Sequence, residues 1–83
     1  AVRQSYQTLL ITYYNDGRLY FMDKPVEIEE LEKVLQQKYQ NPEQVVRIAI
    51  EKQVPVQKLI NLMDIIRNSG YERIFVATTV LEK

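Results

Sequence analysis

A carboxylate and an amine stand side by side at Glu51 and Lys52, directly after an apolar stretch that is predicted to be a strand. Ligands of open α/β sheets often bind just beyond the carboxyl end of a strand, so this pair could mark the edge of an active site. Neighbouring residues at a strand end, however, point to opposite sides. One adjacent Glu-Lys pair is therefore more typical of a connection between two elements than of a catalytic centre.

The chain lacks the side chains on which most catalytic and metal sites depend. It contains no histidine and no cysteine, which removes the usual acid–base group near neutral pH, disulfide frameworks and thiolate metal sites. Glu29 and Glu32 can face each other on a helix, but no third ligand and no nucleophile accompanies them. Gly17 and Gly70 are too few and too far apart for a phosphate-binding loop. We therefore expect no enzyme, no metal and no cofactor.

The composition indicates one small folded domain without a strong electrostatic field. Apolar residues make up 46% and charged residues 27% of the 83 residues, which is ordinary globular usage. Eleven basic and eleven acidic residues cancel, so nucleic acid is not an expected partner, even though six tyrosines could stack on bases. No apolar run approaches the roughly 18 residues of a membrane span. We interpret the start at Ala1 as that of an excised fragment.

Turn residues and hydrophobic periodicity predict six elements in the order β-β-α-β-α-β. The expected strands are 8–14, 18–22, 44–50 and 73–80. The first helix has apolar positions from Ile28 to Tyr39, and the second starts near Pro55 and closes at Gly70. Strand-helix-strand crossovers are almost always right-handed, so two crossovers in the same direction would place both helices on one face. The predicted fold class is α/β, an α+β two-layer sandwich with a mixed sheet.

The sequence also predicts two turns and the two residues of the last strand that face the core. The run at 15–17, Asn-Asp-Gly, is typical of a hairpin that joins the first two strands. The run at 23–25, Asp-Lys-Pro, is interpreted as a second turn before the first helix. In the last strand, Ile74 and Val76 are the expected inward residues. The domain is expected to cover 8–80, after a linker remnant at 1–7 and before a C-terminal tail at 81–83.

Two long stretches resemble the periplasmic domain of the ExbD/TolR family. They are DGRLYFMDKPVEIEELE at 16–32 and VRIAIEKQVPVQKLINLMDIIRNSGYERIFVAT at 46–78. In the order that family members show, they contain the Asp-Gly hairpin, Pro25-Val26, Glu51-Lys52, Val54-Pro55, Met63-Asp64 and Gly70-Tyr71. Two departures are that Asp-Lys is common where Glu51-Lys52 stands, and that many members have tyrosine where Val56 stands. The run MDIIRNSGY is more similar to ExbD than to TolR.

The resemblance implies a subunit of a bacterial inner-membrane complex that transduces energy from the proton motive force. Such a subunit has a single membrane helix with a proton-relaying aspartate, a linker and this periplasmic domain. The implied partners are an ExbB/TolQ-like channel subunit and a TonB- or TolA-like protein, and the implied assembly is a homodimer. The relaying aspartate lies in the membrane helix, outside this chain, so no residue here is expected to carry protons.

The last strand is the expected docking site for the TonB- or TolA-like partner. It is β-branched and nearly free of charge, and few residues follow it. At a sheet edge or a dimer seam, its open backbone groups could receive an extended segment as an added strand; a central position, or solvated threonines, is the alternative. The candidate partner-binding residues are Ile74, Val76, Thr78, Thr79 and Val80.

A small ligand-binding module is the other function that the sequence leaves open. Its site would lie at the strand ends near Glu51 and Tyr71. The walls would come from Leu10, Tyr13, Tyr14 and Tyr20.

Overall fold

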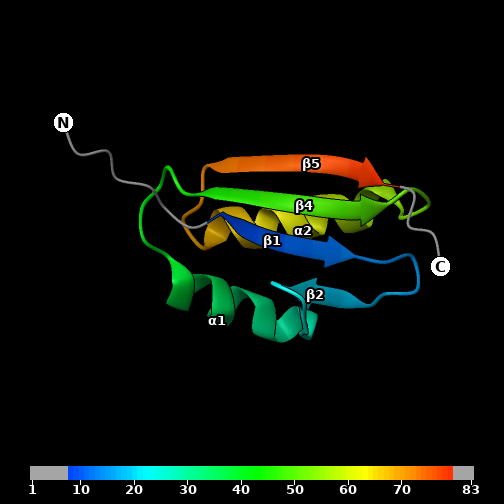
Figure 1. Cartoon of the computed structure of the whole chain (residues 1–83), viewed down its shortest axis with the longest axis horizontal. Helices are drawn as coiled ribbons and strands as arrows, with labels where there is room; N and C mark the ends of the chain where they lie inside the picture. Colours follow the sequence, from blue (N-terminus) through cyan, green and yellow to red (C-terminus); the bar gives the residue numbers. More distant parts are fainter. Residues whose placement is uncertain (1–7, 80–83) are drawn as a thin grey trace.

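The computed structural model describes residues 8–79, which form one mixed sheet and two helices (Figure 1). The predicted linker at 1–7, the tail at 81–83 and Val80 lie outside the described residues. The elements, in chain order, are β1 Leu9–Tyr13, β2 Leu19–Phe21, β3 Lys24–Pro25, α1 Ile28–Lys38, β4 Val45–Glu51, α2 Val56–Asn68 and β5 Arg73–Thr79.

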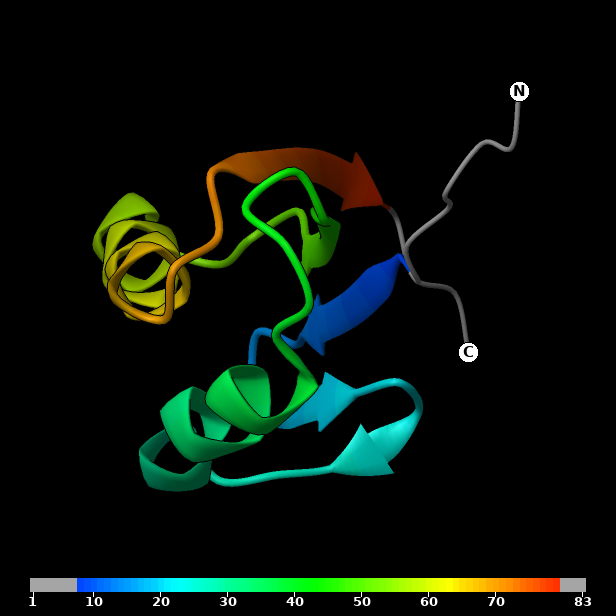
Figure 2. The same ribbon diagram turned by 90° about the vertical axis from the view of Figure 1, so that its left-hand side faces the viewer.

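The strand order across the sheet is β3-β2-β1-β4-β5. β1 pairs antiparallel with β2 and parallel with β4, and β4 pairs parallel with β5. Both helices lie on the same face of this sheet, α1 beside β2 and α2 behind β4 and β1 (Figures 1 and 2). The predicted two-layer α+β sandwich with a mixed sheet is confirmed.

The core lies between the sheet and the helices, and alternation along the strands builds it. Successive side chains of a strand point to opposite faces, so every second residue enters the core. The helices add residues that recur at helical spacing and face the sheet. The buried apolar residues of the strands are Leu9, Ile11, Leu19, Phe21, Val46, Ile48 and Ile50, and those of the helices are Leu31, Leu35, Leu62 and Ile66.

The predicted turn at 23–25 is correct for Asp23 but wrong for Lys24 and Pro25, which form the short strand β3. Phe21 is paired with Lys24, so Met22 and Asp23 alone make the turn. Their φ angles are 51° and 71°, and positive φ at both central residues is what a type I′ hairpin requires. The turn contains neither glycine nor asparagine, the residues by which such a turn is usually predicted. The sequence therefore contains no signal for β3.

Val76 differs from the prediction in its burial. Ile74 and Val76 are paired with Val46 and Ile48 and therefore face the helix side of the sheet, as expected. Ile74 is half-buried, but 39% of Val76 is exposed. The reason is the sheet order: β5 is the last strand, so Val76 has a strand on one side only.

Candidate partner-binding edge

The charged pair after β4 links two loops. The Oε1 atom of Glu51 accepts a hydrogen bond from the backbone N–H of Asn15 at 2.6 Å. The side-chain amide of Asn15 in turn donates to Oε1 of Gln53 at 3.3 Å. Glu51 therefore fastens the β1–β2 hairpin loop to the β4–α2 connection, which agrees with the interpretation of this stretch as a connection.

Metal-binding side chains do not converge in the part of the chain that the structure describes. Within residues 8–79, no group of three or more histidine, cysteine, aspartate or glutamate side chains is placed to hold a metal ion. The acidic residues of α1 are exposed and point away from the core.

The predicted partner-binding residues lie on β5, which forms one edge of the sheet. β5 pairs with β4, and within residues 8–79 no strand lies along its other side. Ile74 is half-buried, whereas Val76 and Thr78 are exposed. Thr79 ends the strand, and neither its side chain nor Val80 belongs to the described part. An edge position is one of the two alternatives that the sequence left open.

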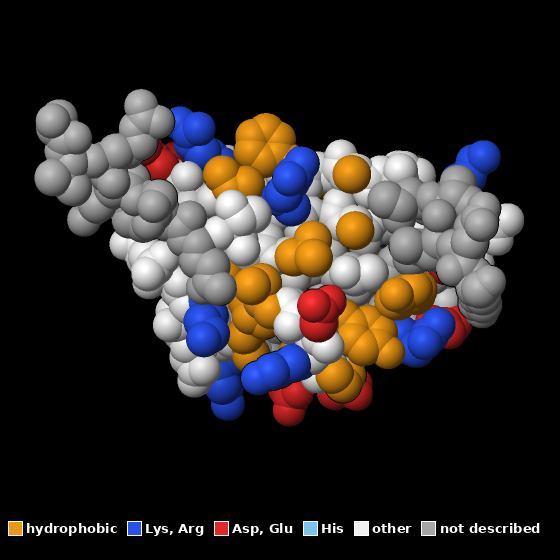
Figure 3. Space-filling view, in the orientation of Figure 1, with side chains coloured by type: hydrophobic (Ala, Val, Ile, Leu, Met, Phe, Trp, Pro, Cys, Tyr) orange, Lys and Arg blue, Asp and Glu red, His pale blue; other side chains and the backbone are white. Residues whose placement is uncertain are grey.

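The prediction missed two further exposed residues of β5 on the opposite face. Phe75 and Ala77 are paired with Arg47 and Ala49, and they point to the side of the sheet that the helices do not cover. Phe75 is 54% exposed. Figure 3 views this uncovered side, where several hydrophobic side chains lie over the strands. The alternation of β5 places Phe75 outward, so the signal was present in the sequence.

The chemistry of this edge suits an extended peptide. An edge strand presents unpaired N–H and C=O groups along its length. β5 has seven residues, and from Ile74 onward it carries neither a charge nor a proline. Charged side chains and proline are two of the features by which natural proteins prevent a sheet edge from pairing with another chain.

The flank of helix α2 that is turned towards the β5 edge carries exposed apolar residues. Lys58 and Asn61 line a groove on the side of α2 that faces α1. Helical periodicity places Val56, Ile60 and Met63 on the opposite flank, on the side of the β5 edge, with Arg67 at its C-terminal end. Val56 is 70% exposed and Ile60 is 43% exposed. A strand added to β5 would therefore find apolar side chains on both faces.

Tyr71 fixes the start of β5 to helix α1. Its side chain is 1% exposed, and its hydroxyl donates to the backbone oxygen of Leu35 at 2.6 Å. Its ring meets that of Tyr39 edge to face, with centroids 5.4 Å apart. Burial raises the pKa of Tyr71 to about 12. Tyr71 is thus part of the scaffold that holds the edge strand in place.

The ligand site that the sequence suggested near Glu51 and Tyr71 is not assembled. Glu51 ends β4, whereas Tyr71 precedes the start of β5, and the two strands run parallel. The two residues therefore lie at opposite ends of the sheet. Of the proposed walls, Tyr14 and Tyr20 meet edge to face at 5.6 Å, and Tyr13 and Tyr20 line the same groove as Lys58.

A comparison with models of protein families identifies one family that matches the chain. A family model described as "Biopolymer transport protein ExbD/TolR" matches residues 2–80, nearly the whole sequence. This match does not distinguish ExbD from TolR. A search among curated proteins found no significant match.

The general properties of this family concern membrane association and transport. It is associated with membranes and with transport, and it is not a family of enzymes. Neither α1 nor α2, the helices within residues 8–79, is long and apolar enough to cross a membrane. The chain belongs to the ExbD/TolR family, whose role is energy transduction for biopolymer transport.

Proposed function

We propose that this chain is the periplasmic domain of an ExbD-like subunit of a proton-motive-force-driven complex in the bacterial inner membrane. In this role it couples an ExbB/TolQ-like channel subunit to a TonB- or TolA-like protein for transport across the outer membrane. Family membership supports the general role. The observation that carries the coupling role is the β5 edge, seven residues long and uncharged from Ile74 onward.

The coupling step is the addition of a strand from the partner. An extended segment of the TonB- or TolA-like protein forms backbone hydrogen bonds with the free edge of β5, and its alternate side chains contact the two faces. On the helix face they meet Val76 and the flank of α2. On the other face they meet Phe75. Backbone pairing supplies most of the affinity, and the side-chain contacts select the partner.

The binding surface can be mapped on an isotopically labelled sample of residues 1–83. We expect the periplasmic segment of a TonB- or TolA-like protein from the same genome to shift the amide resonances of β5 most strongly, followed by those of Val56 and Ile60. A Val76→Lys variant should keep its fold, because Val76 is already 39% exposed, and should bind at least about tenfold more weakly. A Lys52→Gln variant, changed at an exposed loop position, is the control. Shifts confined to other elements would contradict docking at β5.

The parent protein is proposed to be anchored by one membrane helix and to act as a homodimer. A complete reading frame should encode a hydrophobic segment of about 20 residues upstream of Ala1; without it, the membrane assignment fails. Dimerisation of the isolated domain is expected to be weak, because a membrane anchor normally raises the local concentration. Sedimentation equilibrium at high protein concentration should detect it, and a purely monomeric profile would count against it.

A further inference from the structure

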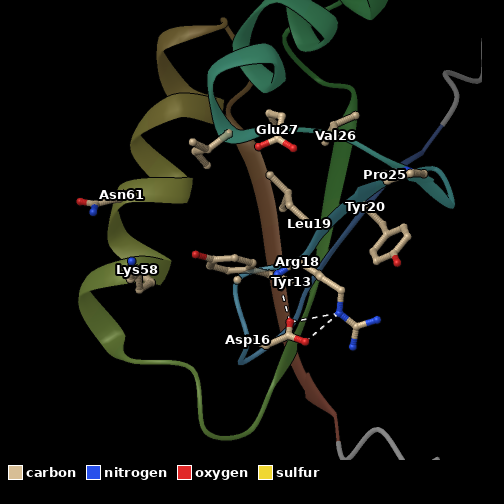
Figure 4. A pocket seen from close by; sticks show the side chains of 12 residues that line it. Tyr13, Asp16, Arg18, Leu19, Tyr20, Pro25, Val26, Glu27, Lys58 and Asn61 are labelled. Atoms are coloured by element: carbon tan, nitrogen blue, oxygen red, sulfur yellow. Dashed lines mark hydrogen bonds and ion pairs between the residues drawn. The ribbon is translucent and has the colours of Figure 1, made fainter.

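A groove of about 720 Å³ opens between the two helices on the helix side of the sheet (Figure 4). Lys58 and Asn61 of α2 form one wall, and Glu27 and Ile28 at the start of α1 form another. Leu19 of β2 lies at the bottom, and the ring of Tyr13 projects into the space with its hydroxyl towards the helix that carries Lys58. This volume falls within the roughly 300–1,000 Å³ typical of small-molecule sites.

The groove offers one cation and one anion that do not neutralise each other. Within residues 8–79, neither Lys58 nor Glu27 forms an ion pair. Arg18, which also lines the groove, differs in this respect. It pairs with Asp16 at 2.8 Å, and its guanidinium lies 4.6 Å from the centroid of the Tyr14 ring. Lys58 and Glu27 therefore remain available for a ligand.

The surroundings of each charge favour a ligand group of opposite sign. Pro55 is the N-cap residue of helix α2 and supplies no side-chain cap, and the first turn of the helix contains no acidic residue. Lys58 is therefore the cation beside a helix end that attracts negative charge. Glu27 is the N-cap of α1 and forms a capping box with Glu30. A carboxylate has more lone pairs than this cap uses, so it can still accept from an ammonium group.

The floor and rim between the two charges are apolar or uncharged. Leu19 and the Tyr13 ring line the floor, and Ile28, which is 41% exposed, lines the rim. A single unpaired cation is a poor match for a nucleotide or a polyphosphate, which call for several cations or a cradle of backbone N–H groups. A neutral sugar would leave both charges without a partner.

We propose that this groove binds a short zwitterionic ligand of the amino-acid or peptide class, with an apolar side chain. Its carboxylate contacts Lys58 at the start of α2, its ammonium group contacts Glu27, and its side chain rests on Leu19 and Tyr13. This site lies on the α1-facing flank of α2, away from the β5 edge, and does not depend on the docking proposed there.

The test uses the dipeptide Leu-Leu in three forms, namely with free ends, with an acetylated amine and with an amidated carboxyl. Each is titrated into residues 1–83 and followed by amide and side-chain resonances. The free dipeptide should shift the groove residues. Each capped form should bind roughly three- to fivefold more weakly, the effect expected of one exposed ion pair.

Two variants assign the two ends of the ligand. Lys58→Gln should remove only the preference for the free carboxyl over the amide. Glu27→Ser should remove only the preference for the free amine over the acetyl form, because serine preserves an N-cap while removing the charge. Lys52→Gln and Glu32→Gln, which lie outside the groove lining, are the matched controls and should retain both preferences.

Two results would overturn the proposal. The first is the absence of groove shifts at millimolar free dipeptide while the protein is folded. The second is equal binding of all three forms, which would show that the groove recognises only an apolar side chain. The Val76→Lys variant should bind the dipeptide normally, so failure at this site and failure at the β5 edge can be told apart.

Discussion

The two edges of the sheet are built in opposite ways. The β3 edge has two residues, Lys24 and Pro25. Proline has no N–H to offer a further strand, and an edge lysine would have to bury its charge on pairing. The β5 edge has seven residues, and from Ile74 onward it contains neither a charged residue nor a proline.

This contrast agrees with the proposal that the β3 edge is closed and the β5 edge pairs with a partner. An unprotected edge is an aggregation hazard, which natural proteins usually suppress. The same chain that suppresses it at β3 leaves it at β5, next to the exposed Phe75 and the apolar flank of α2. Use of the β5 edge by a partner gives a physical reason for this asymmetry.

The largest expected effect on the free energy of unfolding comes from the core beneath the sheet, and a much smaller one comes from the exposed surface of β5. Leu62 of α2 is completely buried, whereas Val76 of β5 is 39% exposed. Leu62→Ala should lower the free energy of unfolding by about 2–5 kcal/mol, through lost burial and the cavity that remains. Val76→Ala should lower it by less than about 1 kcal/mol, because an exposed side chain loses little burial. Urea denaturation measures both, and equal losses would mean that Val76 is a core residue.

The next effect concerns Tyr71, which holds the start of β5. Tyr71→Phe leaves the backbone oxygen of Leu35 without its hydroxyl donor in a buried place, so the free energy of unfolding should fall by about 1–3 kcal/mol. Tyr39→Phe changes the neighbouring ring, which is 38% exposed, and should have a much smaller effect. Comparable losses in the two variants would argue against the role given to the buried hydrogen bond.

The same tyrosine should make stability depend on alkaline pH. The pKa of Tyr71 is raised from 10.0 to about 12 in the folded chain, so its neutral form favours folding. The stabilisation of the folded state by neutral Tyr71 is fully present below about pH 10 and is lost as the pH rises from about 10 to 12. The wild-type free energy of unfolding should therefore decline more steeply in that range than that of Tyr71→Phe. Parallel curves would contradict the raised pKa.

A smaller effect tests whether the β3 edge is closed by its two residues. Replacing both Lys24 and Pro25 by valine should change the free energy of unfolding only slightly, because both side chains are exposed. It should, however, give β3 a hydrogen-bonding, β-branched edge and promote self-association. Sedimentation velocity at increasing concentration would detect this. An unchanged monomer fraction would mean that the short length of β3 is sufficient protection.

Much of the fold follows from the sequence because its strands are buried on one face. Ile11 in β1 and Ile48 in β4 belong to alternating patterns that specify which side enters the core. β3 could not be predicted, because Met22 and Asp23 adopt positive φ angles that their residue types do not demand. The tertiary pairing of Phe21 with Lys24 imposes that turn.

The candidate sites depend on information that local patterns do not contain. The residues of β5 could be singled out from their lack of charge, but their edge position follows from the strand order, which is set by pairing between distant segments. The groove joins Glu27 and Lys58 from different helices. The sequence indicates where each helix runs but not that these two side chains line one space.

Docking at the β5 edge is tested most directly by a pair of adjacent proline variants, Thr78→Pro and Thr79→Pro. The N–H groups of adjacent strand residues point to opposite sides, so one variant removes a bond to β4 and the other removes a donor from the free edge. Hydrogen exchange of the wild type identifies the free one as the faster amide. The variant that loses the free donor should remain folded and bind the TonB- or TolA-like segment about tenfold more weakly. Unchanged affinity in that folded variant would contradict docking at β5.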